Sequence, residues 1–384
     1  MSDPINPPSP AGGSSFGVHF LSDFSSCPTK WYWRNLALWP GVYLSVGNDG
    51  SISGDIPIGG RPSIGRDSLS NLGPEAAEGP SVQSQGMPVG ITPARFKPAL
   101  DTGSRVHAGV AAFYQYGCRD GVDTGERSLS AMLDAARLDP PISGEPDTDL
   151  VESLALTDRM LTRYYETYKN DDGVRVAFDR EGHPLIEREF WLDLGYRDYR
   201  FTCRADLVYW QSGQYLRFME HKTARASDLP KWLKRADIDP QFTGQFLMGV
   251  SHFPDDPFDG VTLNALVKDR AKKSDLPDMM RKTYSRSPAQ LEKFRLDAVR
   301  RLQRIDESVE EWRTLVKQGM EPDDAAKVVF DGSPSGYECV GMGVACDYLG
   351  LCVNRERLSS LLLDSYEPRH YKYEWENPLR KGLK

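Results

Sequence analysis

The chain has 384 residues, of which 39% are hydrophobic, 27% charged and 10% aromatic. This length suits one large domain with insertions or two smaller domains, and the composition excludes a wholly disordered or fibrous chain. The formal net charge of −8 and the pI near 5.4 exclude a globally basic, histone-like nucleic-acid binder, although they leave room for a local basic groove.

The sequence contains no recognisable signal for membrane insertion or export. No apolar run approaches the roughly 18–20 residues that cross a bilayer, and the N-terminus has neither the basic start nor the apolar stretch of a secretory signal. We therefore expect a cytoplasmic protein with no membrane partner. In that reducing compartment, the six cysteines favour thiols or metal ligands over disulfides.

The N-terminal quarter divides into three segments by composition. Residues 1–15 are rich in Pro, Ser and Gly, which predicts disorder. Residues 16–45 are aromatic-rich and predict a helical segment that contains Cys27, with Ser22 as a helix cap. Residues 46–98 form a Gly/Ser/Pro-rich insertion, too polar to bury a core of its own.

Residues 99–290 are predicted to form the core. Apolar residues at helical spacing predict helices, and period-two alternation with aromatic or β-branched residues predicts strands. The expected elements are helices at 102–116, 149–168 and 240–250, and strands at 185–194, 199–209, 215–222 and 261–267. Short turns between the first three strands favour an antiparallel meander.

The C-terminal segment, residues 291–384, holds most of a long charged helix predicted over 288–317, then a cysteine-rich region and a tail. Hairpins flanked by helices predict an α/β fold with a mixed central β-sheet.

The most informative local pattern is acidic. Asp206 lies in the second predicted strand, and Glu220-His221-Lys222 lies in the third. Alternate strand residues share a face, so Glu220 and Lys222 point the same way and His221 points to the other side. Antiparallel pairing across the turn can bring Asp206 beside Glu220. Two adjacent carboxylates repel unless a cation lies between them, and oxygen ligands suit Mg²⁺ or Mn²⁺.

A lysine beside such a metal site can orient a water molecule or stabilise charge on a phosphate, which is the chemistry of phosphodiester hydrolysis. The alternative that the residues leave open is a solvated Glu–Lys pair on a surface strand. The apolar residues around the pair favour a site, because unpaired charges are costly in a half-buried setting.

These residues and several others resemble the PD-(D/E)xK nuclease superfamily, in particular its RecB-like branch of CRISPR-adaptation iron–sulfur nucleases, AddB-type subunits and phage exonucleases. The family's motifs are matched in order by Thr102–His107 (its G…H helix), Leu185–Phe190 (its first core strand), Phe201–Asp206 (its aspartate strand), Glu220–Lys222 (its (D/E)xK signature) and Pro240–Gln245 (its QxxxY helix). The sequence departs from the family at three positions. Cys203 replaces a glycine, Ala205 replaces the eponymous proline, and Gln245 replaces the tyrosine.

The resemblance implies a restriction-endonuclease-like core and a set of metal ligands. His107, Asp206, Glu220 and the backbone carbonyl of His221 would hold one or two Mg²⁺ or Mn²⁺ ions. Glu187 or Glu189 is open to two interpretations, support of a second metal or an edge-strand salt bridge. The catalytic set implied by the family is Asp206, Glu220, Lys222 and Gln241. In that set Lys222 acts on the water or the transition state, and Gln241 contacts Lys222 or the DNA backbone.

The cysteines extend the resemblance. Cys27-Pro-Thr-Lys-Trp-Tyr resembles the family's CPxxxYY opening, and Cys346-Asp-Tyr-x3-Cys352 resembles its closing CxYxxxC. With Cys339, these thiolates would hold a [4Fe–4S] cluster that ties the N- and C-terminal segments together. A structural Zn²⁺ site and free cysteines are the alternatives. Cys118 and Cys203 match no ligand position and are expected to be plain thiols.

Nucleic-acid contacts are expected where basic and aromatic residues alternate. The candidate segments are 30–34, 231–235, 268–273, 281–286 and the tail 369–384. No GxxxxGK[ST] motif is present, so unwinding of a duplex would need a partner.

The leading hypothesis is therefore a metal-dependent DNA nuclease, an exonuclease on DNA ends or single strands, that acts in recombination, repair or phage DNA processing in a bacterium or bacterial host cell. Its expected partners are DNA and a recombinase, single-strand-binding protein or helicase. The alternatives are a catalytically weak DNA-binding scaffold subunit and a small-molecule hydrolase with a zinc site.

Overall fold

The structure is a computed structural model, and it describes residues 18–37, 43–46, 52–55, 91–93, 98–137, 148–197, 199–268, 279–330, 339, 346–353 and 366–368. The chain divides into two compact units. The first is built mainly from residues 96–194 and 200–298, and the second from 19–95, 195–199 and 299–384. Helix α8 (Pro288–Lys317) begins in the first unit and continues into the second. Within the described ranges, no helix combines the length and apolar character that a membrane span requires.

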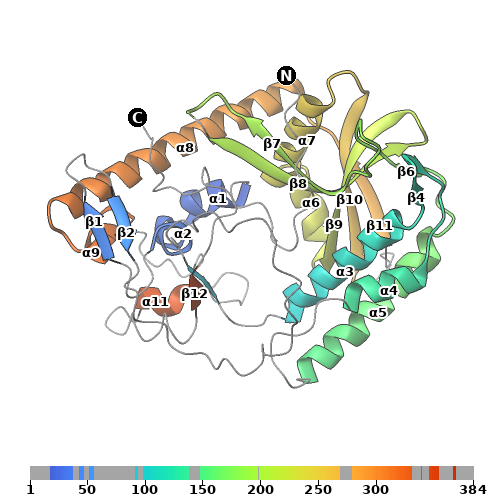
Figure 1. Cartoon of the computed structure of the whole chain (residues 1–384), viewed down its shortest axis with the longest axis horizontal. Helices are drawn as coiled ribbons and strands as arrows, with labels where there is room; N and C mark the ends of the chain where they lie inside the picture. The colour runs from blue at the N-terminus through green and yellow to red at the C-terminus, as the bar shows by residue number, and fades with distance from the viewer. Residues whose placement is uncertain are drawn as a thin grey trace, which may run out of the picture. The chain divides into compact units, whose positions relative to one another are not determined.

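The first unit contains a mixed sheet with helices on both faces (Figure 1). Its helices are α3 (Pro98–Gln115), α4 (Leu129–Arg137), α5 (Thr148–Tyr168), α6 (Leu229–Ala236) and α7 (Pro240–His252). Its strands are β4 (Cys118–Arg119), β5 (Val122–Asp123), β6 (Val174–Val176), β7 (Ile186–Asp193), β8 (Arg200–Gln211), β9 (Tyr215–Ala224), β10 (Phe258–Val267) and β11 (Met279–Tyr284).

The six-stranded sheet has the order β11-β10-β9-β8-β6, and β7 also pairs with β8. Strands β7, β8 and β9 form the predicted antiparallel meander. Strand β10 runs parallel to β9, and β11 is antiparallel to β10. The expectation of an α/β fold with a mixed central sheet flanked by helices is therefore confirmed.

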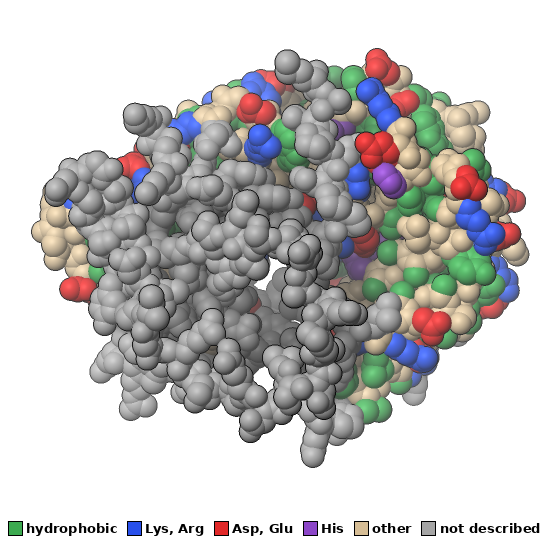
Figure 2. Space-filling view, viewed as in Figure 1, with side chains coloured by type: hydrophobic (Ala, Val, Ile, Leu, Met, Phe, Trp, Pro, Cys, Tyr) green, Lys and Arg blue, Asp and Glu red, His purple; other side chains and the backbone are tan. Residues whose placement is uncertain are grey.

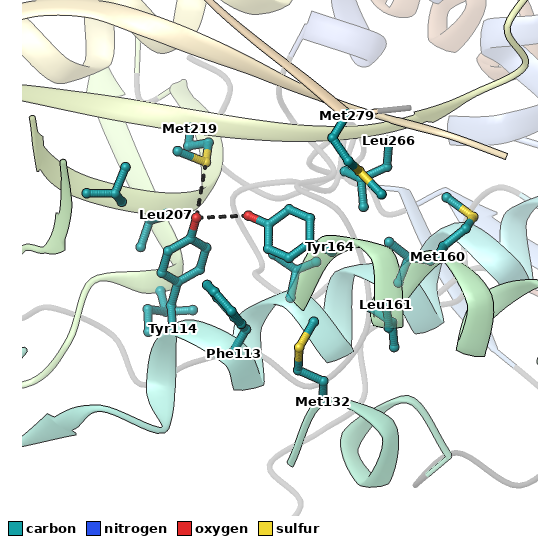
Figure 3. Packing of buried hydrophobic residues seen from close by; sticks show 14 of the residues in the cluster. Phe113, Tyr114, Met132, Met160, Leu161, Tyr164, Leu207, Met219, Leu266 and Met279 are labelled. Carbon is teal, nitrogen blue, oxygen red and sulfur yellow. Dashed lines mark hydrogen bonds between the residues drawn. The ribbon is translucent and has the colours of Figure 1, made fainter. Parts of the chain in front are cut away.

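The main core lies between one face of this sheet and helices α3, α4 and α5. Figure 3 shows Leu207, Met219 and Leu266 of the sheet facing aromatic and sulfur-containing side chains of the helices. The hydroxyls of Tyr114 and Tyr164 lie 2.8 Å apart inside this apolar layer, so each satisfies the other's polar group.

Helix α7 covers the opposite face and lies unusually close to it. A Cβ atom at Gly249 would lie 2.1 Å from the Phe258 ring, and one at Gly244 would lie 2.7 Å from the ring of Phe201. The helix begins at Pro240, where the Asp239 carboxylate caps it by accepting a hydrogen bond from the N–H of Gln241 at 2.8 Å. Both features fix the position of α7 against β8, β9 and β10.

The second unit is built around aromatic side chains. Its described elements are α1 (Val18–Ser26), α2 (Pro28–Asn35), β1 (Tyr43–Val46), β2 (Ile52–Asp55), β3 (Ile91–Pro93), α9 (Pro322–Val329), α11 (Leu349–Val353), β12 (Tyr366–Pro368) and the rest of α8. The fully buried Trp31 stacks on Phe330, and Thr29 donates to the Phe330 carbonyl at 2.6 Å. Aromatic packing therefore joins the early segment to the late one.

Most predicted elements of the core appear with ends within a few residues of the expected ones, and the long helix spans 288–317 as expected. The predicted cap at Ser22 is wrong, because Ser22 lies inside α1; Cys27 caps the following helix, α2, by accepting from the N–H of Lys30. The predictions for 1–15, for most of 46–98 and for the tail 369–384 fall outside the described residues.

Candidate metal centre and catalytic site

Strands β8 and β9 separate at the acidic residues. Their ladder ends at the pair Leu207 and Met219, and Asp206 and Glu220 are the next residues in the same register. In place of a further ladder bond, the backbone N–H of His221 donates to the Asp206 carboxylate at 2.6 Å. The gap between the two strands therefore carries carboxylates where backbone hydrogen bonds would otherwise continue.

Glu187 reaches this gap from β7. The register of β7 and β8 places it opposite Asp206, between two ladder pairs. Its φ of 51° lies in the left-handed region, which costs a non-glycine residue on the order of 1 kcal/mol. Strain of this kind persists where the surrounding structure holds it in place, and it clusters at functional sites.

His107 completes a group of possible metal ligands. Its Nδ1 lies 3.6 Å from an oxygen of Asp206 and 3.9 Å from Oε1 of Glu187. One ligand atom from each of these three residues lies within 4.8 Å of the others. Arg204 pairs with the second oxygen of Glu187 at 2.7 Å. Oε1 of Glu187 is buried and has no hydrogen-bond partner among the described residues.

The charged groups at this site shift one another's pKa values. Burial by itself lowers the pKa of His107, but the carboxylates of Asp206 and Glu187 outweigh it and raise that pKa to about 9. Burial and the neighbouring Asp206 raise the pKa of Glu187 to about 7. The pKa of Asp206 is well below its usual range, because His107 and the His221 N–H outweigh the effect of burial.

The three residues fit a divalent cation. Two carboxylates and an imidazole are ligand types that Mn²⁺ accepts, and carboxylates are the ligands that Mg²⁺ prefers. The buried oxygen Oε1 of Glu187 supports a bound cation most directly. A buried oxygen without a hydrogen-bond partner costs about 1–3 kcal/mol unless something binds it. A cation between these groups would supply that partner and compensate the repulsion between Asp206 and Glu187.

Glu220 and Lys222 lie on the α7 side of β9. They share a face as predicted, with Lys222 Nζ 2.5 Å from Oε1 of Glu220. Gln241 and Gln245 of α7 donate to Oε1 and Oε2 of Glu220, at 2.7 and 2.5 Å. Burial raises the pKa of Glu220, and although burial lowers that of Lys222, Glu220 outweighs it and the lysine pKa is raised. Lys222 is therefore held in its charged form.

His221 points to the opposite face, as the alternation predicts. Its ring lies parallel to that of Tyr114, with centroids 6.3 Å apart, and its Nδ1 is 2.8 Å from the side-chain amide of Asn264. Burial lowers the pKa of His221 to about 3, so the ring is neutral. Its backbone N–H donates to Asp206, and the role of its backbone carbonyl as a metal ligand stays a prediction.

The structure clarifies residues that sequence reasoning left open. Glu187, rather than Glu189, joins the ligand group, and it makes the salt bridge to Arg204 as well. Gln245, which stands where the family has a tyrosine, donates a hydrogen bond from its side-chain amide to Glu220. The signal for Glu187 was present in the sequence, since counting back along two antiparallel strands places it opposite Asp206.

The proposed cluster cysteines all lie in the second unit. Burial raises the pKa of the Cys346 thiol, and the neighbouring Cys27 thiol adds to the rise. The N–H of Cys346 donates to the carbonyl of Cys339 at 2.7 Å. Among the residues that the structure describes, no three cysteine sulfurs lie within 4.8 Å of one another. Cys27, Cys339, Cys346 and Cys352 form no disulfide, and their role as cluster ligands stays a prediction.

Basic residues in two of the predicted nucleic-acid segments bind other residues of the protein. In 30–34 the basic ends, Lys30 and Arg34, both pair with Asp23, and the aromatic residues between them are buried. In 281–286, Arg281 donates to the buried Tyr114 and Tyr164 hydroxyls, and Arg286 is bonded to Thr243 and a backbone carbonyl. These arginines hydrogen-bond buried polar groups, whereas Lys282 in the same segment is exposed. Most of 268–273 lies outside the described residues.

Segment 231–235 lies in α6 and keeps its basic side chains exposed. Leu229 and Ala236 are buried and anchor the helix, while Lys231, Lys234 and Arg235 face solvent. Figure 2 shows that basic and acidic side chains of the described residues are interspersed on the visible face. Helix α6 follows directly on the strand that carries Glu220 and Lys222 and precedes the helix that carries Gln241.

A mixed sheet whose separating strands present carboxylates beside a lysine defines a nuclease-like hydrolase. Comparison with protein families gives the same answer: a model described as the PD-(D/E)XK nuclease superfamily matches residues 84–352. The chain belongs to this superfamily, whose members are generally metal-dependent nucleases. A search of curated proteins finds no match.

Proposed function

We propose that the protein is a divalent-metal-dependent DNA nuclease, and that it acts as an exonuclease on DNA ends or single strands. The observation that carries the proposal is the group of His107, Glu187 and Asp206, with its unpartnered buried oxygen, at the strand gap that also holds Glu220 and Lys222. When bound, Mg²⁺ or Mn²⁺ would lower the pKa of a water molecule and neutralise the scissile phosphate.

The chain's own residues have distinct roles in this proposal. His107, Glu187 and Asp206 hold the ion, and Glu220 joins them from the other side of the gap. Glu220 also keeps Lys222 charged, so that the ammonium group can stabilise the negative charge that develops on the phosphate. Gln241 positions Glu220 through its 2.7 Å hydrogen bond, and the backbone of His221 positions Asp206.

We propose that α6 guides the substrate toward this gap. Lys231 and Lys234 are exposed on a helix that follows the catalytic strand after a short turn, and their charge would attract a phosphate backbone. Because the net charge of the chain is −8, a local basic helix of this kind is the feature that would permit DNA binding.

The cysteines, the pathway and the cellular setting form a separate part of the proposal. We propose that Cys27, Cys339, Cys346 and Cys352 bind a structural [4Fe–4S] cluster, with Zn²⁺ as the alternative. The role of such a cluster would be structural, because hydrolysis of a phosphodiester needs no electron transfer. Iron, sulfide and zinc content of anaerobically purified protein decides between the two.

The proposed process is recombination, repair or phage DNA processing in a bacterial cytoplasm, with a recombinase, single-strand-binding protein or helicase as partner.

The nuclease proposal is tested with end-labelled single- and double-stranded DNA and Mg²⁺ or Mn²⁺. We expect metal-dependent cleavage that is lost in Lys222→Met, which keeps the length of the side chain but removes its charge. Shortening from one end would support the exonuclease assignment, and the product ladder would give the polarity. A wild-type protein that binds DNA but leaves it intact with every metal would instead be a scaffold subunit.

A further inference from the structure

Helix α7 presents two glutamines to one carboxylate. Gln241 and Gln245 are four residues apart, so they lie on the same face of the helix. Gln241 donates to Oε1 of Glu220 at 2.7 Å, and Gln245 donates to Oε2 at 2.5 Å. Each oxygen of the carboxylate is therefore bound by a different amide, which fixes the plane of the carboxylate as well as its position.

The two oxygens of Glu220 are not equivalent. A carboxylate can accept about four hydrogen bonds, two at each oxygen. Oε1 accepts from Gln241 and faces the Lys222 ammonium at 2.5 Å, so both of its positions are used. Oε2 accepts from Gln245 alone among the described residues. Oε2 is consequently the oxygen that retains an open position for an ion or a water molecule.

Gln245 itself has an open position beside Oε2. It is only 2% exposed, and its amide oxygen is buried without a hydrogen-bond partner among the described residues. The amide nitrogen must face Glu220, because a carboxylate only accepts hydrogen bonds. The amide oxygen is thus left as a buried acceptor, and a water molecule beside Oε2 could donate to it.

From this geometry we propose that Gln245 is a positioning residue: it holds Glu220 so that Oε2 stays free for a divalent ion or its water, while Gln241 and Lys222 occupy Oε1. The inference rests on the proposed nuclease function and deepens it. An uncharged amide suits this role, because a cationic donor at the same place would repel the metal ion.

The backbone under Gln245 is fixed firmly enough for the role. Gly244 precedes it, and a Cβ atom at that position would lie 2.7 Å from the Phe201 ring. The helix therefore packs against β8 at the turn that carries both glutamines. Sites on rigid elements hold their geometry better than sites on loops, so we expect the distances from α7 to Glu220 to vary little.

The test uses Gln245→Met in the full chain, because methionine keeps the approximate volume and removes the amide. We expect the dissociation constant for Mn²⁺, measured by calorimetry without DNA, to increase about 10-fold, as for loss of other groups that orient a metal ligand. Single-turnover cleavage at saturating Mn²⁺ should also slow. A second variant, Gln245→Asn, keeps the amide but is one methylene too short to reach Glu220, and it should show the same loss.

The matched control is Thr243→Val on the same helix. The Thr243 hydroxyl is buried, accepts from Arg286 at 2.9 Å and donates to the Asp239 carbonyl at 3.1 Å. Its loss should lower the melting temperature and leave Mn²⁺ affinity unchanged.

Two outcomes would overturn the inference: wild-type Mn²⁺ affinity in folded Gln245→Met and Gln245→Asn, or an equal loss of affinity in Thr243→Val. Failure of the nuclease proposal is recognised separately, because the wild type itself would then neither bind Mn²⁺ nor cleave DNA.

Discussion

Two buried aspartates of the first unit, Asp123 and Asp206, differ in how their charge is compensated. Asp123 accepts four hydrogen bonds at 2.9 Å, two from the guanidinium of Arg127 and two from the backbone N–H groups of Gly125 and Val176. Every acceptor position is filled, and the charge is matched by one arginine. Such a carboxylate needs nothing further, and its role is structural.

Asp206 is equally hidden from solvent but is not matched in this way. It accepts from one backbone N–H and lies near His107, and a second carboxylate with an unpartnered oxygen lies opposite it. The comparison teaches that burial of an acid is not in itself a sign of function. The informative feature is the buried carboxylate oxygen beside it that has no hydrogen-bond donor among the described residues, because folding alone would not retain such an oxygen.

The largest expected effect is the loss of activity at Asp206. Asp206→Asn should reduce DNA cleavage per folded molecule by about 10³-fold, since it removes a proposed metal ligand. The free energy of unfolding should fall as well, because the pKa of Asp206 is lowered in the folded protein and the substitution removes the charge that faces His107. Cleavage assays and urea denaturation on the same preparation check both statements. Wild-type cleavage by the folded variant would mean that Asp206, like Asp123, has a structural role.

Asp123→Asn should lower stability but keep the activity. It removes the charge that faces the buried Arg127, so we expect the free energy of unfolding to fall by about 3 kcal/mol while metal-dependent cleavage per folded molecule is kept. Denaturation followed by circular dichroism measures the change. Strong loss of cleavage in the folded variant would place Asp123 in the site.

The same pair predicts a pH dependence. Although burial raises the pKa of Asp123, the bonds from Arg127 and the backbone outweigh it and lower that pKa below its unfolded value. Its stabilising contribution is therefore full above the unfolded pKa of about 3.9 and is lost as the pH falls through the folded pKa. The stability difference between wild type and Asp123→Asn should shrink as the pH falls below about 4. A constant difference would contradict the charge-based explanation.

Bound metal should stabilise the protein through Asp206 and not through Asp123. With Mn²⁺ at about 100 times its dissociation constant, the wild type should gain about 2.7 kcal/mol. Asp206→Asn should gain much less, and Asp123→Asn should gain as much as the wild type. Thermal unfolding with and without Mn²⁺ measures the three shifts. Equal gains in all three proteins would place the bound metal elsewhere.

The smallest expected effect concerns α6. Lys231→Glu with Lys234→Glu should weaken DNA binding by about 10-fold and reduce the slope of log affinity against log salt by about 2. The control changes two exposed basic residues on other elements, Arg119→Glu with Lys293→Glu, and alters net charge equally. Equal weakening in both double variants would show an effect of net charge rather than a binding surface.

Local patterns in the sequence predicted much of the fold. Period-two alternation predicted β7, β8 and β9, and the apolar stripe predicted α8, because side-chain periodicity depends only on backbone geometry. Short or polar elements such as β6 and β11 were missed. Each is an edge strand, which pairs with one neighbouring strand instead of two. A long apolar run is therefore less needed there than in a central strand.

What the sequence determined by itself was the chemistry of the pair Glu220 and Lys222, because two residues on one strand face meet whatever the rest of the chain does. Only the tertiary structure decided that Glu187 faces Asp206, that Gln245 contacts Glu220, and that Arg281 donates to the tyrosines of the core. These contacts depend on strand register and helix packing between residues far apart in the chain, and no local pattern records them.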